Sequence, residues 1–331
     1  LSYELALSIP DTLAQPVTGT NVLRFDLDDP TRPLVIDFDA EGAADATITA
    51  NGVVVPTRAV NGHLVIPAAP LRRGENTVRI DFRAGNAPLN RSADFLYTWF
   101  VPAQARRALP CFDQPDLKGR WTVTLEHPAE WQSVAKGAER DRVRTGDRVR
   151  VRFDETQPLP TYVVAFVVGD MKIETATRAG RTMRMFHREN DAAKLARNRD
   201  ALFDLHAQAL DEVERYTGIP YPFGKFDFVL VPAFQPGAME HAGNIAYKAE
   251  SLLLDETATQ DELLDRAHVI AHETAHMWFG NLVTMRWFND VWTKEVFANF
   301  VADKVTETQF PQMRHGLKFF LVNHGWAYAV D

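Results

Sequence analysis

The sequence has little cysteine, no long apolar run and no block of basic residues. Cys111 is the single cysteine of the 331 residues, which excludes an intramolecular disulfide framework, and we interpret it as a buried structural thiol rather than a nucleophile. No run of about eighteen apolar residues is present, and no basic segment followed by an apolar stretch opens the chain. The sequence therefore predicts neither a membrane span nor a signal peptide. A cytoplasmic location is the expectation, although a removed signal peptide would leave the same trace.

The charge balance also argues against two classes of binding partner. The formal net charge is −8, and no basic stretch is interleaved with aromatic residues. Neither nucleic acid nor an anionic membrane is therefore an expected partner. Hydrophobic residues make up 46% of the chain and charged residues 24%, which is typical of a globular fold, and the length predicts two domains. These quantities leave the oligomeric state open.

Short segments with alternating or β-branched residues recur through the first half of the chain. Asn51-Gly52 and Asn61-Gly62 are hairpin-type turns between such segments. The expected strands are 3–9, 22–27, 34–38, 47–49, 64–66, 77–82, 121–126, 149–153 and 162–168. Residues 1–175 are therefore predicted to form an all-β domain.

The hydrophobic periodicity changes after about residue 176. The pattern predicts a strand over 182–187, a long amphipathic helix over 192–216 and a strand over 226–231. Two further helices follow, and they carry the residues with the clearest chemical signal. Residues 176–331 are therefore predicted to form an α/β domain.

His272, Glu273 and His276 form a His-Glu-x-x-His sequence on the first of these two helices. Residues four apart lie on one face of a helix, so both imidazoles can reach one metal ion while Glu273 lies beside it. Thr259 and Glu262 suit a capping box at the start of this helix. Gly280 suits its C-terminal cap.

Glu295 lies on the second helix, with eighteen residues between it and His276. Asn289 or Asp290 can cap this helix, which places Glu295 in its first turns. The expected apolar face consists of Val291, Trp292, Val296, Phe300 and Val301.

Two histidines and one carboxylate are the ligands of a catalytic zinc ion with an open fourth position. The sequence therefore predicts one Zn²⁺ per chain, bound by His272, His276 and Glu295. Glu273 is the expected general base, taking a proton from the attacking water and passing it to the leaving amine. Seven other histidines lie outside this ligand spacing and are interpreted as structural: His63, His127, His187, His206, His268, His315 and His324.

The sequence around this site resembles a known family. Residues 269–285 read VIAHETAHMWFGNLVTM, residues 237–243 read GAMEHAG, and residues 109–115 read LPCFDQP. Together with 162–170 and 221–225, these segments closely resemble the gluzincin aminopeptidases of the aminopeptidase N and leukotriene hydrolase family. The resemblance runs from about residue 90 to about 305 and follows the family order.

The resemblance implies an N-terminal β-saddle domain over 1–175 and a thermolysin-like zinc catalytic domain over 176–331. It also implies that the catalytic domain is incomplete at its C-terminal end. The expected substrates are peptides with a free N-terminus. By resemblance, Glu240 anchors the free α-amino group, and the strand with Gly237 and Ala238 lines the substrate with its backbone.

Some residues depart from the family pattern. His241 stands where asparagine is usual, and Trp99 and Val101 replace two polar residues usually near the substrate terminus. We therefore expect a preference for large hydrophobic first residues and weaker amine binding. The family's transition-state tyrosine is expected beyond Asp331, since the surroundings of Tyr328 do not resemble its segment.

Two alternatives to an aminopeptidase stay open. An endopeptidase or epoxide-hydrolysing variant would keep the zinc but lose the amine requirement. A zinc-binding but catalytically weak or silent fragment would follow from the missing tyrosine.

Overall fold

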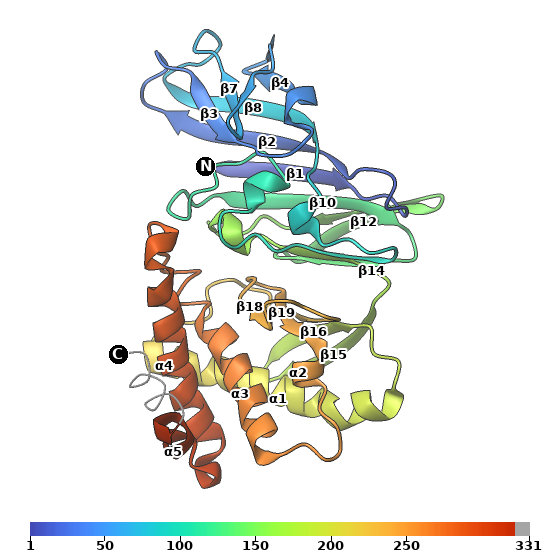
Figure 1. Ribbon diagram of the computed structural model, residues 1–331, viewed down its shortest axis with the longest axis vertical. Helices are drawn as coiled ribbons and strands as arrows, with labels where there is room; N and C mark the ends of the chain where they lie inside the picture. Colours follow the sequence, from blue (N-terminus) through green and yellow to red (C-terminus); the bar gives the residue numbers. More distant parts are fainter. Residues whose placement is uncertain (322–331) are drawn as a thin grey trace. The chain divides into compact units, whose positions relative to one another are not determined.

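The computed structural model describes residues 1–321, which divide into two compact units (Figure 1). The N-terminal unit comprises Leu1–Met171, His241–Asn244 and Arg286–Phe288. The C-terminal unit comprises Lys172–Glu240, Ile245–Met285 and the described residues 289–321. A β-rich part is therefore followed by a part that carries the long helices. Within the described residues, no helix is long and apolar enough to cross a membrane.

An eight-stranded sheet forms the frame of the N-terminal unit, in the order β12-β13-β10-β1-β2-β8-β4-β5. Strands β1 and β10 pair in parallel, and the other neighbours are antiparallel. Its strands are β1 (Ser2–Ser8), β2 (Thr18–Leu27), β4 (Thr47–Ala50), β5 (Val53–Val55), β8 (Gly74–Arg83), β10 (Arg120–Pro128), β12 (Glu139–Thr145) and β13 (Arg148–Phe153).

Two three-stranded sheets complete this unit. One has the order β11-β14-β9 and the other β3-β7-β6. Their strands are β3 (Leu34–Asp37), β6 (Ala59–Val60), β7 (His63–Ile66), β9 (Phe95–Tyr97), β11 (Gln132–Ala135) and β14 (Phe166–Gly169). Short 3-10 helices lie between the strands: η1 (Ala43–Asp45), η2 (Ala87–Leu89), η3 (Ala105–Arg107) and η4 (Thr161–Val163).

Alternating side chains build the core of the N-terminal unit. Along β1, Tyr3, Leu5 and Leu7 are buried while their neighbours are more exposed, as a strand with one solvated face requires. The ring of Tyr3 stacks on Trp121 of the adjacent β10, with 3.8 Å between ring centroids. The large apolar side chains therefore fix the register of this pair.

Both expected hairpin turns are confirmed. Asn51 and Asn61 have positive φ angles of 48° and 50°, and the glycine after each is also in the positive-φ region. They join β4 to β5 and β6 to β7, as this dipeptide favours in two-residue hairpin loops.

The prediction of a single strand over 162–168 was wrong. The chain instead forms η4 after Pro160, and only then β14. Every residue of this stretch is buried, so its sequence lacks the alternation that separates a strand from another buried conformation.

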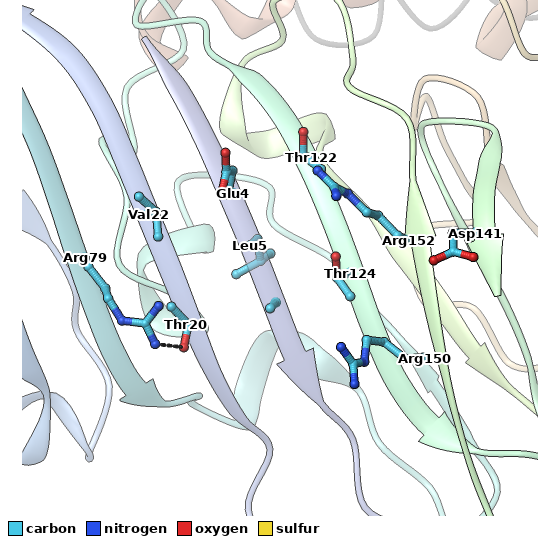
Figure 2. A pocket seen from close by; sticks show the side chains of 11 residues that line it. Glu4, Leu5, Thr20, Val22, Arg79, Thr122, Thr124, Asp141, Arg150 and Arg152 are labelled. Atoms are coloured by element: carbon cyan, nitrogen blue, oxygen red, sulfur yellow. Dashed lines mark hydrogen bonds between the residues drawn. The ribbon is translucent and has the colours of Figure 1, made fainter. Parts of the chain in front are cut away.

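A hollow of about 530 Å³ lies on the exposed face of the eight-stranded sheet (Figure 2). Arg150 and Arg152 of β13 lie on one side of it and Arg79 of β8 on the other, with Thr20 and Thr124 between. Arg79 donates hydrogen bonds to Thr20 and to Asp81, so part of its charge is balanced locally.

A five-stranded sheet, in the order β15-β16-β17-β19-β18, forms the base of the C-terminal unit. Its strands are β15 (Lys172–Arg178), β16 (Arg181–His187), β17 (Phe228–Val231), β18 (Ala238–Met239) and β19 (Ile245–Lys248). The helices are α1 (Ala192–Thr217), α2 (Ala249–Leu252), α3 (Gln260–Ala275), α4 (Val291–Gln309) and α5 (His315–Phe319), with the 3-10 turns η5 (Phe288–Asp290) and η6 (Pro311–Met313).

Local capping explains where α3 begins, but the expected end was wrong. The Thr259 side chain accepts from the Glu262 backbone, and the Glu262 side chain accepts from the Thr259 backbone, which confirms the capping box. The helix ends at Ala275 with His276 as its C-terminal cap, several residues before Gly280. The backbone then continues in turns, with Gly280 at φ 134°.

The expected apolar face of α4 was largely wrong, although Val301 is buried as expected. Trp292, Val296 and Phe300 are exposed among the described residues, whereas α4 buries Lys294, Ala298, Val301, Ala302, Val305 and Thr306. Asp290 occupies the N-cap position, but its side chain makes no capping hydrogen bond. Small residues on the buried face let α4 pack closely on α3, and this tertiary contact overrides the simple apolar pattern.

Asp227 joins strands β16 and β17 through a buried ion cluster. Its carboxylate accepts from the Arg184 side chain at 2.7 Å and 3.0 Å and from Lys225 Nζ at 3.0 Å. Asp227→Asn is expected to lower the free energy of unfolding by about 2–3 kcal/mol, because both cations lose their charged acceptor. Urea unfolding measures this change. Asp200→Asn, at an exposed ion pair, is the matched control, and equal effects of the two substitutions would contradict the prediction.

His206 of α1 should make the unfolding free energy depend on pH. Burial lowers its pKa from 6.5 to about 4, and the ring stacks on Phe228 with centroids 4.0 Å apart. Since the folded pKa lies below the unfolded value, stability is full above pH 6.5 and is lost as pH falls towards 4, by about 3 kcal/mol. In His206→Phe the unfolding free energy should fall less steeply over this window. Urea unfolding at several pH values tests this, and identical slopes in the two proteins would refute it.

Candidate metal centre

Two antiparallel helices bring three candidate metal ligands together. His272 and His276 come from the end of α3, and Glu295 comes from the first turns of α4. The two Nε2 atoms lie 2.9 Å apart, and each lies 3.3 Å from Glu295 Oε2. The structure therefore brings together the three residues that the sequence predicted as ligands.

Hydrogen bonds at the far side of each ring orient the imidazoles. His272 Nδ1 lies 2.9 Å from Asn299 Oδ1, and His276 Nδ1 lies 2.9 Å from the backbone oxygen of Phe279. Both partners are acceptors, so each Nδ1 carries the hydrogen and each Nε2 lone pair faces the cluster. The turn that follows α3 supplies the Phe279 oxygen.

This donor set fits a zinc ion. Ligands about 2.0–2.1 Å from a tetrahedral ion lie about 3.3 Å from one another, close to the separations found here. The side-chain exposure rises from 1% for His276 to 15% for His272 and 42% for Glu295. The cluster is therefore held inside the unit on one side and open on the other, where a water or substrate could enter.

Glu273 lies beside this cluster without belonging to it. A carboxylate oxygen of Glu273 lies within 4.8 Å of a ring nitrogen of His276 and of a carboxylate oxygen of Glu240. Its Oε2 atom is buried and makes no hydrogen bond with any of the described residues 1–321. Burial raises the pKa of Glu273 to about 8, with His276 acting against the shift and Glu240 adding to it. A raised pKa makes the ionised Glu273 a stronger base, and a buried oxygen without a partner among residues 1–321 is suited to accept a proton from a bound molecule.

Lys294 is a site residue that sequence reasoning missed. Its Nζ donates to Glu240 Oε1 at 2.6 Å and to Glu295 Oε1 at 2.5 Å, and its side chain is only 4% exposed. Burial alone would raise the pKa of Glu240, but Lys294 outweighs it and lowers that pKa to about 2. The available sequence signal was the position of this lysine directly before the candidate ligand Glu295. It was missed because the expected apolar face of α4 placed Lys294 on the exposed side of the helix.

The remaining expected substrate residues lie in different parts of the chain. Gly237 has φ 83°, and Ala238 lies on β18, the edge strand of the five-stranded sheet. Glu240 is 2% exposed, and its backbone oxygen accepts from the Asn281 side chain. His241 is buried within a segment that belongs to the N-terminal unit, as do Trp99 and Val101.

The other expectations have mixed outcomes. Tyr328 and His324 lie outside the described residues. His268 and His315, expected to be structural, both contact Asp303 and form a second cluster of possible metal ligands. Neither spacing along one helix nor a known motif predicts this group, because its members come from α3, α4 and α5.

Comparisons with known proteins agree with the fold and the motifs. Residues 202–330 match the model of the peptidase family M1 domain, and residues 86–163 match that of the peptidase M1 N-terminal domain. Aminopeptidase M1-B of Oryza sativa subsp. japonica is 32% identical over 96% of this chain, and aminopeptidase M1 of Arabidopsis thaliana is 30% identical over 96%. Endoplasmic reticulum aminopeptidase 2 of Homo sapiens is 34% identical over 66% of this chain and 22% of its own length.

The matches also define how much of a relative this chain represents. It spans 38% of the length of each of the two plant relatives. Its β-rich part and its helix-containing part correspond to the N-terminal and catalytic domains of the family, which confirms the predicted fold class. On these matches, the chain belongs to peptidase family M1.

Proposed function

We propose that the protein is a zinc-dependent aminopeptidase, which removes the N-terminal residue from peptides. The observation that carries this proposal is the cluster of His272, His276 and Glu295 with Glu273 beside it. The family and the names of the relatives support hydrolysis of peptides.

The chain's own residues divide the chemistry between them. His272, His276 and Glu295 would hold one Zn²⁺. When bound, zinc would polarise the carbonyl group of the substrate and lower the pKa of a bound water. Glu273 accepts the proton of the attacking water at its buried Oε2 and later passes it to the leaving amine. The products are a carboxylate and a free amine.

Substrate recognition is proposed to use β18 and Glu240. Strand β18 lies at the edge of its sheet, where β19 is its only partner strand among residues 1–321, so its outer backbone groups can pair with an extended peptide. Glu240 would hold the α-ammonium group of that peptide. Lys294 already donates to this carboxylate, which supports the prediction of weak amine binding. The preference for large hydrophobic first residues stays a prediction. The contributions of His241, Trp99 and Val101 stay predictions.

The Lys294 contact also favours a second candidate function. A peptidase of this fold that does not require a free amine, such as an endopeptidase, would tolerate a cation at Glu240. No contact within residues 1–321 specifically favours an epoxide-hydrolysing variant or a catalytically silent zinc-binding chain, and both stay open. A cytoplasmic location stays a prediction.

Hydrolysis of matched leucyl and lysyl substrates, each with a free and an acetylated amine, tests the proposed function. Bound zinc is quantified in the same samples, and activity is followed through chelation and zinc addition. Cleavage of the free leucyl substrate alone, lost on chelation and restored by zinc, is the expected result. Cleavage of acetylated substrates would favour the second candidate, and stoichiometric zinc without turnover would contradict the proposal.

A further inference from the structure

A second group of metal-binding side chains lies one helical turn along α3 from the first. His268 Nε2 lies 3.1 Å from Asp303 Oδ1, and His315 Nε2 lies 2.8 Å from the same oxygen. These donor atoms all lie within 4.8 Å of one another. The three residues come from α3, α4 and α5, so tertiary packing alone brings them together.

The register of the two long helices produces both groups. On α3, His268, His272 and His276 recur every four residues, and Glu295, Asn299 and Asp303 do the same on α4. His276 contacts Glu295, His272 contacts Asn299, and His268 contacts Asp303. The same face that positions the proposed catalytic ligands therefore continues into the second group, about 6 Å further along α3.

We propose that His268, Asp303 and His315 form a second site for a divalent transition-metal ion, separate from the proposed catalytic zinc. Two imidazoles and one carboxylate are a donor set that suits Zn²⁺ and Co²⁺. The side chains of His315 and Asp303 are 8% and 20% exposed, so the group is partly shielded from water.

The charge and the space around this group suit a cation. Asp303 supplies a partly buried carboxylate that contacts both imidazoles. Asp303 and His315 also line a cavity of about 540 Å³ formed by α1, α4 and α5. This cavity leaves room for a water as a further ligand. A bound ion would tie the short helix α5 to α3 and α4.

Titration with Co²⁺ tests the site, because tetrahedral cobalt is coloured and is counted by its visible absorption. The wild-type chain is expected to bind two equivalents. The His272→Ala/His276→Ala variant should retain one, which isolates the second site from the proposed function. Adding His315→Gln to that variant removes a ligand and should weaken the remaining site by more than about 10–100-fold, the loss typical for a residue that only orients a ligand. Asp303→Asn should have the same effect.

Control variants separate metal binding from a loss of structure. His63 contacts Asp37 without a third candidate ligand, so His63→Gln should leave cobalt binding unchanged. Far-UV circular dichroism identifies any variant that fails to fold, in which case Glu295→Gln replaces the double variant. One equivalent in the wild-type chain and none in the folded double variant would overturn the second site. That result would leave the proposed catalytic site intact.

Discussion

Glu273→Gln should lower the rate of peptide hydrolysis by about 10²–10⁴-fold without removing the metal. Glutamine keeps the size of the side chain but cannot accept the proton of the attacking water. The ligands His272, His276 and Glu295 are unchanged, so zinc content should stay at the wild-type level. The measurements are kcat on a free leucyl substrate and bound zinc in the same preparation.

The matched control for this substitution is Glu250→Gln on α2, an exposed residue whose nearest partner is Lys248. It should change neither kcat nor zinc content. If Glu273→Gln kept wild-type kcat, Glu273 would not be the general base. If the variant lost its zinc, the fall in rate would instead report damage to the metal site.

Lys294→Met should lower the free energy of unfolding by about 3–5 kcal/mol. The Lys294 ammonium is the shared hydrogen-bond donor of Glu240 and Glu295, and both it and Glu240 are almost fully buried. Methionine fills a similar volume but leaves the Glu240 carboxylate buried without its cation. Chemical unfolding followed by circular dichroism measures the change.

Lys304→Met on the same helix is the control, since Lys304 lies over the ring of the exposed Phe300. It should shift the free energy of unfolding by less than about 1 kcal/mol. Similar losses in the two variants would show that the buried lysine does not stabilise the unit. The Michaelis constant for free-amine substrates should also change in Lys294→Met, because Glu240 would then be available to the substrate ammonium.

The parts of the fold that depend on neighbouring residues could be predicted from the sequence. The capping box at Thr259 and the two asparagine-glycine turns are local signals, and the structure has all three. The three candidate ligands were also predictable. Four-residue spacing brings His272 and His276 together on one helix face, and the motif points to Glu295.

Features that depend on tertiary packing could not be predicted in this way. Lys294 is buried because α4 turns its alanines towards α3, whereas Trp292, Val296 and Phe300, which indicated the opposite face, are exposed. Asp303 meets His268 and His315 only because the two helices have one register and α5 folds back beside them. The register between α3 and α4 cannot be predicted from a single sequence.

The helix pair α3–α4 also has a consequence for folding. All the candidate ligands of both clusters lie between His268 and His315, so the two helices can meet once the segment between them closes. The entropic cost of closing such a segment grows only slowly with its length, so this contact does not require the other parts of the chain to be folded. A cation could then bind partly folded chains in which only these helices have met. It would raise the free energy of unfolding by less than its affinity for the native chain implies.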